Sequence, residues 1–375
     1  MSATTKLRVR QALVGACLMS AAGFAAAEYG LNLPPGVTSI AQEAYSLHML
    51  ILWICIAIGV VVFGAMFYSI IYHRKSKGAV AAQFHESTAV EIAWTIVPFL
   101  ILIGMAIPAT KALIAMEDTS NSDLSIKVTG YQWKWQYEYL DEDVSFFSTL
   151  STPKEEIFNK VEKNPAYLLE VDNPVVVPVG KKVRLLITAN DVIHAWWVPE
   201  LGMKKDAIPG FVNEMWFNID RPGTYRGQCA ELCGKDHGFM PIVVVAKEQA
   251  DYEKWVAEQK QSAAAAAADS DREYSMDELM ARGEKVYAGN CAACHQANGE
   301  GVPGAFPALK GGAITVGPVA GHIDIVLDGK GGTAMAAFAG QLNDADLAAV
   351  ITYERNAWGN STGDIVQPAD VKAAR

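Results

Sequence analysis

Two long runs without charged side chains constrain this chain more than any other feature. The first covers residues 47–72 and the second covers 92–110, and neither contains Asp, Glu, Lys or Arg. A helix needs about 20 apolar residues to cross a bilayer, where the backbone must satisfy its own hydrogen bonds. Pro98 and Pro108 interrupt the second run, which neighbouring helices tolerate in a membrane. We therefore expect a two-helix transmembrane hairpin, with helices at about 47–72 and 91–115.

The segment before the hairpin, residues 1–27, has the composition of a secretory signal peptide. Basic residues come first, a short apolar run follows, and small residues at positions 25–27 offer a cleavage site. Processing as a lipoprotein at Cys17 is the alternative. The mature chain is thus expected to begin at Glu28 or at a lipidated Cys17. In both cases the chain directly after the signal peptide is exported, and residues 28–117 comprise the N-terminal segment and the hairpin.

Basic residues between the two runs predict the orientation of the hairpin. Arg74, Lys75 and Lys77 lie in the connecting segment, and loops rich in Lys and Arg stay on the cytoplasmic side. Both outer ends of the hairpin then face outward, as does everything after about residue 117. We expect a multi-pass protein of the bacterial inner (cell) membrane with two helices, whose later domains lie on the periplasmic or outer side.

Charge and cysteine positions narrow the class of partner. The formal net charge is -10, which disfavours a nucleic-acid partner. The positive mean hydropathy agrees with membrane segments. Of the six cysteines, four form two close pairs beside histidines. That pattern is typical of metal or haem sites more than of disulfides.

After the hairpin, the chain changes character several times. Residues 118–248 contain short β-branched runs between Gly, Pro, Asn and Asp, as in a β-sandwich or barrel, although the polar insert at 141–169 fits no element. Residues 249–271 read as a helix and an Ala-rich linker, helical or flexible. Residues 272–359 hold two helical stretches around a Gly/Pro-rich middle. The tail, 360–375, is expected to be disordered or loosely attached.

One loop concentrates the ligands of a soft metal. From Cys229 to Met240 the sequence reads Cys-Ala-Glu-Leu-Cys-Gly-Lys-Asp-His-Gly-Phe-Met. Thiolate, imidazole and thioether ligands together select copper or another soft metal. A mononuclear blue-copper site needs one Cys, two His and a weak Met, so the second thiol, Cys233, indicates a second copper ion. His194 would have to come from another strand. A Cys229–Cys233 disulfide and a zinc site are the alternatives, although methionine is an unusual zinc ligand.

The hairpin and this loop resemble one family. Residues 40–247 look like subunit II of haem-copper respiratory oxidases, in which a two-helix hairpin precedes a cupredoxin domain. The spacing Cys-x-Glu-x-Cys-x-x-x-His-x-x-Met is similar to that family's dinuclear copper A motif. The resemblance also implies that the side chain of Glu231 binds a magnesium or manganese ion shared with subunit I. The copper ligands that it implies are His194, Cys229, the carbonyl of Glu231, Cys233, His237 and Met240.

An aromatic string lies upstream of the loop. Aromatic and polar residues alternate over Gly130–Tyr139, which predicts a strand with one aromatic face. Ordinary packing of that face against the sandwich explains most of these rings. The string also resembles the family's aromatic cluster between the copper and the electron donor. By that resemblance Trp133 would receive electrons at the surface, supported by Trp135 and Tyr137.

Glu91 stands at the cytoplasmic edge of the second apolar run. A carboxylate there can be a simple end residue that reaches the membrane interface, and ionisable groups at membrane depth are also functional candidates. The segment Glu91–Pro98 resembles the family's Glu-x-x-Trp-Thr-x-x-Pro motif, whose glutamate lies at the mouth of a proton pathway into subunit I. The resemblance makes Glu91 a candidate for proton uptake.

A second constellation lies in the helical region. Residues 291–295 read Cys-Ala-Ala-Cys-His. The Cys-x-x-Cys-His pattern attaches a c-type haem through thioethers to Cys291 and Cys294, with His295 as an iron ligand. A chance match and a redox Cys-x-x-Cys are the alternatives.

The sixth iron ligand can be narrowed to two residues. Downstream of His295 there is one methionine, Met335, and one other histidine, His322. We favour Met335, because His/Met ligation raises the haem potential and suits a donor to copper. Its loop resembles the class I cytochrome c ligand loop, with Ala336 in place of the usual proline. His322 is then expected at the surface or beside a propionate.

Nearly the whole mature chain is similar to subunit II of a cytochrome c oxidase with a fused cytochrome c domain, as in caa3-type enzymes. The expected fold is multidomain, with the transmembrane hairpin, a β-sandwich or barrel cupredoxin domain and an all-α class I cytochrome c domain. The resemblance implies cofactors of two copper ions and one covalent haem c. It also implies partner subunits I and III, and a cytochrome c or a quinol-cytochrome c reductase as the electron donor.

The implied activity belongs to the complex. Electrons would pass through haem c and copper to haem a and the haem-copper site of subunit I, where O2 is reduced to water with proton translocation. A membrane-tethered electron carrier without an oxidase partner is the alternative, but it needs one helix and no membrane carboxylate. A copper domain like that of nitrous oxide reductase would leave the hairpin and the cytochrome unexplained.

Overall fold

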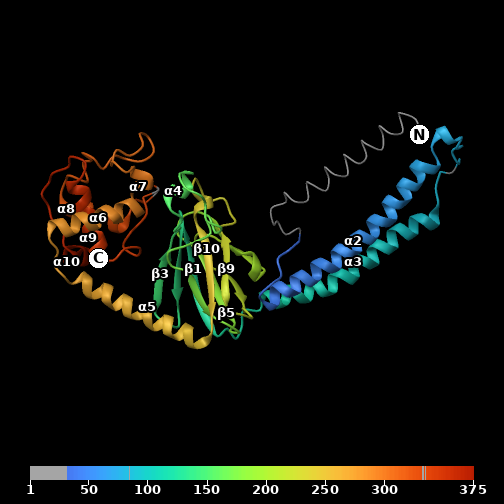
Figure 1. Cartoon of the computed structure of the whole chain (residues 1–375), viewed down its shortest axis with the longest axis horizontal. Helices are drawn as coiled ribbons and strands as arrows, with labels where there is room; N and C mark the ends of the chain where they lie inside the picture. The colour runs from blue at the N-terminus through green and yellow to red at the C-terminus, as the bar shows by residue number, and fades with distance from the viewer. Residues whose placement is uncertain (1–31, 84, 332, 334) are drawn as a thin grey trace, which may run out of the picture. The chain divides into compact units, whose positions relative to one another are not determined.

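The computed structural model describes residues 32–83, 85–331, 333 and 335–375 (Figure 1). The predicted signal peptide, with both candidate mature N-termini, lies outside the described residues. The chain divides into two compact units. One contains the residues up to Asp141 and Ser148–Gln249, and the other contains Glu142–Phe147 and Ala250–Arg375. The hairpin and most of the β-rich region therefore share a unit, and the helical region forms the other.

The hairpin consists of two long helices, α2 (Ser39–Tyr72) and α3 (Thr88–Glu117), with the short 3-10 helix η1 (Lys75–Lys77) between them. Figure 1 shows α2 and α3 side by side. Their most apolar windows have mean hydropathies of 2.8 and 2.2, and the protein buries neither window. Long helices that expose apolar side chains on all sides fit a bilayer better than water.

α2 begins at Ser39, earlier than the expected start at residue 47. The reason is a cap and a packing contact that the hydropathy pattern does not reveal. The Thr38 side chain accepts a hydrogen bond from the Ala41 backbone N–H and donates one of 2.9 Å to the carbonyl of Leu201. Ile40 and Ala41 are buried. The first turn of α2 therefore packs against the β-rich region, outside the apolar run.

α3 extends beyond the expected range of 91–115 at both ends and continues through Pro98 and Pro108. Its last turn is attached to the β-rich region, because the indole N–H of Trp216 donates a hydrogen bond of 3.1 Å to the carbonyl of Ala115. Both helices of the hairpin are thus joined to the β-rich region at the same end of the hairpin.

The β-rich region is built from short strands separated by helical turns. The turns are α4 (Lys154–Ile157), η2 (Pro199–Leu201) and η3 (His237–Phe239). The strands are β1 (Leu124–Tyr131), β2 (Lys134–Tyr139), β3 (Val144–Ser148), β4 (Val175–Pro178), β5 (Val183–Ala189), β6 (His194–Val198), β7 (Met203–Ala207), β8 (Asn213–Phe217), β9 (Gly223–Gln228) and β10 (Pro241–Lys247).

These strands form the predicted β-sandwich. One sheet has the order β3-β2-β1-β5-β8, another has the order β4-β10-β9, and β6 pairs with β7. β1 pairs antiparallel with β2 and parallel with β5. Buried and half-buried side chains alternate along β5, where Val183, Leu185 and Ile187 point into the core. This alternation is what a strand with one face on the core requires.

The aromatic string is not one strand, so that prediction is wrong. β1 ends at Tyr131 and β2 begins at Lys134, with a turn at Gln132 and Trp133. The two strands then pair antiparallel, with Tyr131 opposite Lys134. The alternation concealed the turn because polar and aromatic residues continue across it. The aromatic face exists within β2, where three rings are buried: Trp135, Tyr137 and Tyr139.

The polar insert, which fitted no element in the sequence, contributes β3 and the single turn α4. Around them, side-chain hydrogen bonds replace regular structure. Glu156 accepts hydrogen bonds from the backbone and side-chain nitrogens of Asn164, and Asp172 accepts two from Thr149. The bonded residues are 8 and 23 positions apart, and such bonds leave no apolar periodicity in the sequence.

The helical unit contains one long helix and a compact bundle. The long helix, α5 (Gln249–Ser270), is continuous through the Ala run, because Ala has the highest helix propensity. The bundle consists of α6 (Met276–Asn290), α7 (Ala292–His295), α8 (Val319–Asp328), α9 (Asp344–Asn356) and α10 (Pro368–Ala374).

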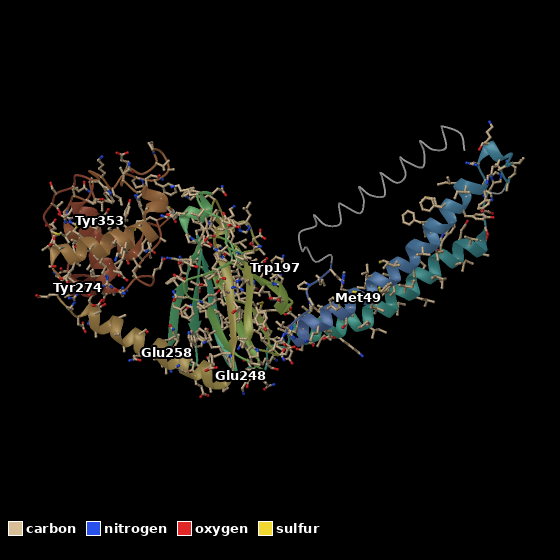
Figure 2. All side chains as sticks on the ribbon, viewed as in Figure 1. Met49, Trp197, Glu248, Glu258, Tyr274 and Tyr353 are labelled. Atoms are coloured by element: carbon tan, nitrogen blue, oxygen red, sulfur yellow. The ribbon has the colours of Figure 1, made fainter. Side chains whose placement is uncertain are left out.

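The core of the bundle lies between α6 and α9. Gly283 allows their close approach, because a Cβ there would lie 2.1 Å from the carbonyl oxygen of Ala349. Beside this crossing the rings of Tyr287 on α6 and Tyr353 on α9 pack with their centroids 5.7 Å apart. Figure 2 labels Tyr353 within this helical unit.

The tail is ordered, so the prediction of a disordered or loosely attached segment is wrong. Val366 and Val371 are 1% and 0% exposed and belong to the core of the bundle. The Gln367 side chain accepts a hydrogen bond from the backbone N–H of Tyr274 and donates one to its carbonyl. Two buried valines and the Gln367 amide hold α10 against the bundle. Two apolar residues in a polar segment do not produce a helical periodicity that the sequence would reveal.

Candidate metal centre

The metal-ligating loop, residues 229–240, joins the neighbouring antiparallel strands β9 and β10. β9 ends at Gln228 and β10 begins at Pro241, and these two residues face each other in the β9–β10 register. The backbone N–H of Ala230 donates a hydrogen bond of 3.0 Å to the carbonyl of Ala195 in β6. The loop is therefore closed at both ends by a ladder and held against β6, whose first residue is His194.

The donor atoms that the sequence singled out lie together. Cys229 Sγ is 3.9 Å from Cys233 Sγ, 4.0 Å from His194 Nδ1 and 3.3 Å from the carbonyl oxygen of Glu231. Cys233 Sγ is 3.5 Å from both His237 Nδ1 and Met240 Sδ. His194, Cys229, Cys233 and Met240 are all less than 5% exposed. Two thiols thus stand between two imidazoles, with the thioether and the carbonyl at either side.

The arrangement is chemically suited to a pair of soft metal ions. Each thiol has its own imidazole, and both imidazoles present Nδ1 to sulfur. The carbonyl of Glu231 serves the Cys229 side and the thioether of Met240 serves the Cys233 side. Two thiols, two imidazoles, a thioether and a carbonyl are donors that would hold copper, whereas calcium and magnesium prefer oxygen ligands.

The two thiols differ in their ionisation. Burial raises the pKa of the Cys229 thiol, but hydrogen bonds with His194 and two backbone groups outweigh it and lower that pKa to about 7. Burial, together with the charge of Cys229, raises the pKa of Cys233 to about 12. Burial also lowers the pKa of His194, yet Asp191 and Cys229 leave it raised overall. The site therefore holds protons that a metal must displace.

Asp191 is a functional residue that the sequence reasoning missed. Its Oδ1 lies 2.9 Å from His194 Nε2, which fixes the ring so that Nδ1 faces the thiols. Its Oδ2 accepts a hydrogen bond of 2.8 Å from the backbone N–H of Gln132. The available signal was a carboxylate three residues before a candidate ligand. Gly130 leaves room for the His194 ring, because a Cβ at position 130 would lie only 2.8 Å from a ring carbon.

The predicted aromatic residues surround the loop in different ways. Trp133 is half-buried and donates its indole N–H to the Cys233 carbonyl at 3.2 Å, beside the Gln132 side chain, which donates to the same carbonyl at 2.8 Å. Trp135 is fully buried and donates to the Met240 carbonyl at 3.3 Å. Tyr137 is one layer deeper, where its hydroxyl accepts from the Trp196 indole.

Two other predicted residues lie outside this cluster. The side chain of Glu231 is exposed, while its carbonyl faces Cys229. Glu91 is exposed in the first turn of α3. Figure 1 shows that α3 begins at the end of the hairpin away from the β-rich region. Carboxylates at these two places are available to a neighbouring chain.

The Cys-x-x-Cys-His segment forms a local helical turn after α6. The backbone N–H groups of Cys294 and His295 both donate to the carbonyl of Cys291, at 3.1 and 2.9 Å. His295 is 8% exposed, and its Nδ1 lies 2.9 Å from the carbonyl oxygen of Pro307. With Nδ1–H donated to that carbonyl, Nε2 is left as the ligand atom. The two thiols stand one turn apart beside it, which fits the covalent attachment of a haem.

Met335 lies on a separate loop between α8 and α9. Backbone hydrogen bonds tie this loop to α8, from Phe338 to Val326 and from Ala339 to Leu327. The loop closes on itself through the bond from the Lys330 N–H to the Met335 carbonyl, 3.0 Å. Met335 is half-buried, and its role as the sixth iron ligand stays a prediction.

His322, the competing candidate, is not a surface residue, so that part of the prediction is wrong. It is 1% exposed, and its Nε2 lies 2.8 Å from a side-chain oxygen of Glu354 on α9. Its partner carboxylate lies 32 positions along the chain, and a sequence pattern does not report that proximity.

Three family models match successive parts of the chain, and all three describe subunits of cytochrome c oxidases. Residues 26–112 match the family model "Cytochrome C oxidase subunit II, transmembrane domain", and residues 124–247 match "Cytochrome C oxidase subunit II, periplasmic domain". Residues 278–353 match "Cytochrome C oxidase, cbb3-type, subunit III".

Individual relatives give the same result. The probable cytochrome c oxidase subunit 2 of Rickettsia bellii is 38% identical over 255 residues, covering 67% of this chain and 93% of the relative. Cytochrome c oxidase subunit 2 of Cereibacter sphaeroides is 35% identical over 240 residues, covering 60% and 79%. The crystal structure of the periplasmic domain of subunit II (CoxB) of Bradyrhizobium japonicum is 43% identical, covers 38% of this chain and 98% of that one, and has a TM-score of 0.35.

Proposed function

Because the chain belongs to the cytochrome c oxidase subunit II family and carries a C-terminal cytochrome c-type domain, we propose that it relays electrons from a donor through haem c and a dinuclear copper centre to subunit I. The observation that carries this proposal is the donor cluster around Cys229 and Cys233, which has the number and type of atoms that two copper ions need.

The copper ions would be held by the six donors of the cluster. Cys229 and Cys233 supply thiolates, and the donors beside each thiol complete one ion's set. When bound, copper supplies the one-electron redox chemistry of the site. The chain's own residues keep the set in place: Asp191 orients His194, while Gln132 and Trp133 hold the Cys233 carbonyl. The proposed ligands are His194, Cys229, the Glu231 carbonyl, Cys233, His237 and Met240.

Haem c would be attached by Cys291 and Cys294, and His295 and Met335 would bind its iron. The carbonyl of Pro307 fixes the ring of His295, so the imidazole presents Nε2 in one orientation. A hydrogen bond to Nδ1–H also increases the basicity of the ring, which strengthens its bond to iron.

Electrons would enter the copper centre near Trp133. This ring is half-buried above the Cys233 carbonyl, with the ammonium of Lys235 5.7 Å from its centroid. Trp135 and Tyr137 would support the site from the core side, where both are buried. A hydrogen bond from the Trp133 indole to the backbone of a copper ligand gives a short covalent and hydrogen-bonded route from the ring to the thiolate.

Two carboxylates are proposed for roles at the boundary with other subunits. The exposed side chain of Glu231 would bind a magnesium or manganese ion shared with subunit I, since both ions prefer oxygen ligands. Glu91, exposed in the first turn of α3, would take up protons for subunit I. The further partners would be subunit III and a cytochrome c or a quinol-cytochrome c reductase as donor.

The chain has the transmembrane and periplasmic domains of subunit II. We place it in the bacterial inner membrane, with Arg74, Lys75 and Lys77 on the cytoplasmic side. The domains that we propose are 1–27 for the signal peptide, 28–117 for the hairpin, 118–248 for the cupredoxin domain, 249–271 for the linker helix, 272–359 for the cytochrome domain and 360–375 for the tail.

The experiment is a metal and spectral analysis of the purified full-length chain in its oxidase complex. Copper and iron are counted by elemental analysis, covalent haem by the pyridine haemochrome spectrum, and the copper centre by EPR. We expect two copper ions and one covalent haem for each copy of this chain, and a mixed-valence copper signal. A mononuclear blue-copper signal would refute the dinuclear site, and isolation of the chain without a haem a subunit would refute the oxidase assignment.

A further inference from the structure

The cytochrome domain contains a buried pair of ionisable side chains that the proposed function does not use. His322 on α8 and Glu354 on α9 are 1% and 4% exposed, and His322 Nε2 lies 2.8 Å from Glu354 Oε2. Within the described part of the chain, His322 Nδ1 is buried and has no hydrogen-bond partner. Nε2–H is therefore donated to the carboxylate, and Nδ1 carries a lone pair that can accept a proton.

Packing does not explain this pair. It lies among apolar side chains of α8 and α9, where Ile323, Val326 and Ile351 are each at most 6% exposed. A buried ionic or polar pair is weak evidence for stability, because well-packed apolar residues of similar volume often stabilise a protein as much or more. An unpartnered buried nitrogen adds a further cost.

The pair lies close to the haem-attachment segment. Tyr287 on α6 connects the two: its hydroxyl donates a hydrogen bond of 2.6 Å to the carbonyl of Gln296, the residue after His295. Burial and the negative charge of Glu354 raise the pKa of Tyr287, so Glu354 is within electrostatic reach of this ring. Cys291 packs against the same apolar core as Ile323.

A second connection runs through Asn360. Its side-chain nitrogen donates to the backbone carbonyl of Glu354 at 2.7 Å and to that of Leu309 at 3.2 Å. Leu309 is two residues after Pro307, whose carbonyl orients His295. The segment that carries Glu354 is thus joined by one amide to the segment that orients the iron ligand.

The other ionisable groups near the pair are ion-paired, uncharged or exposed to solvent. Arg355, next to Glu354, donates to the carbonyls of Thr315 and Gly317 and forms an ion pair with Asp364. The neighbouring tyrosines, Tyr287 from α6 and Tyr353 from α9, have raised pKa values because they are buried, and so stay neutral. On α8 itself, Asp324 is exposed to solvent.

We propose that the His322–Glu354 pair is a redox-linked proton site of the cytochrome domain, which binds a proton on Nδ1 of His322 when the haem is reduced and releases it on oxidation. The proposal rests on the haem c site proposed above. On reduction, one electron comes from the donor protein and one proton comes from water. On oxidation, the electron leaves toward copper and the proton returns to water.

The physical reason is the charge of the site. Oxidised iron carries one more positive charge than reduced iron, and charges interact strongly in a low-dielectric interior. The imidazolium form of His322 is therefore more favourable beside the reduced haem. Because reduction then takes up a proton, the midpoint potential of the haem decreases as the pH rises.

The test is a spectroelectrochemical titration of haem c in the intact oxidase between pH 5 and pH 9. The wild-type potential is expected to decrease with pH, and Glu354→Gln and His322→Gln are each expected to remove most of that dependence. Glu354→Gln should also raise the potential at high pH, because it removes a negative charge. The matched control is Asp324→Asn, which removes the same charge from an exposed position two residues from His322 and should leave the slope unchanged.

Two results would overturn the proposal. The first is a wild-type potential that does not change with pH, which needs no variant and is therefore independent of folding. The second is a slope that survives in both folded variants, which would assign the proton to the haem propionates instead. Absence of a covalent haem spectrum would contradict the proposed haem c site, and this outcome is visible before any potential is measured.

Discussion

The copper loop and the haem-attachment segment assemble their ligands in different ways. The donors of the copper loop come from residues 229–240 and from His194, and they meet only because β9, β10 and β6 hold them. The haem-attachment segment, residues 291–295, is a single helical turn whose ligands are neighbours in the sequence. The candidate for the sixth iron ligand, Met335, lies on a separate loop.

This difference has a consequence for how each site responds to change. The copper donors are mutually supporting, since each thiol lies within 4.0 Å of another donor atom. Removal of one thiol therefore affects both metal positions. The haem segment depends on a local turn and on the Pro307 carbonyl, so damage to the copper loop should leave it intact, and the reverse should also hold.

The largest effect is expected from Cys229→Ser. Cys229 lies between His194, Cys233 and the Glu231 carbonyl, so its loss removes one of the two proposed thiolate ligands and should abolish the two-copper signal in EPR. The covalent haem spectrum should be unchanged. Cys55→Ser, at an exposed position in α2, is the control and should retain both signals; a two-copper signal in Cys229→Ser would contradict the ligand set.

The converse change is His295→Ala. It removes the proposed iron ligand and the hydrogen bond to Pro307, so we expect the low-spin haem c spectrum to be lost while the copper EPR signal remains. Asn298→Ala, three residues away at an exposed position, should change neither. A low-spin haem that persists in His295→Ala would show that another residue binds the iron.

A smaller effect is expected from Asp191→Asn. The substitution weakens the hydrogen bond that orients His194 and, by the usual effect of such partners, should lower copper affinity by about 10–100-fold. Competition with a copper chelator measures this change. Asp236→Asn, within the same loop, is the control, because its carboxylate lies 3.8 Å from Lys235 Nζ and, among the described residues, bonds to no proposed ligand side chain. Equal affinity in both variants would mean that Asp191 does not support the site.

The pH dependence of copper binding is the smallest of these effects when it is expressed per pH unit. Cys233 has a pKa raised to about 12 and Cys229 has a pKa of about 7. Copper must displace the Cys233 proton throughout the neutral range and the Cys229 proton below about pH 7. Affinity should therefore rise about tenfold for each pH unit above 7 and more steeply below it. Chelator competition at several pH values tests this, and an affinity independent of pH would be inconsistent with a protonated Cys233.

Much of the molecule could be predicted from its sequence because the signals are local. The hairpin follows from two uncharged runs, β5 and β10 follow from β-branched runs, and the copper donors follow from a loop of twelve residues together with His194. These features depend on residue type and spacing, which the chain displays directly.

The predictions that were wrong concern features that depend on tertiary contacts. Val366 and Val371 anchor the tail, although two valines in a polar segment carry no periodic signal. The turn at Gln132 and Trp133 is concealed by an alternation that continues on both sides of it. His322 is buried only because α9 brings Glu354 to it. In each case a partner distant in the sequence decides the outcome.

The central claim is that electrons leave haem c through the copper centre of the same chain. The most direct measurement reduces the oxidase fully without oxygen, mixes it rapidly with O2 and follows the haem c absorption, in the wild type and in Cys229→Ser. We expect haem c to be oxidised promptly in the wild type and to stay reduced in Cys229→Ser, while haem a is oxidised in both. Equally rapid oxidation of haem c in a Cys229→Ser enzyme that lacks copper would contradict it.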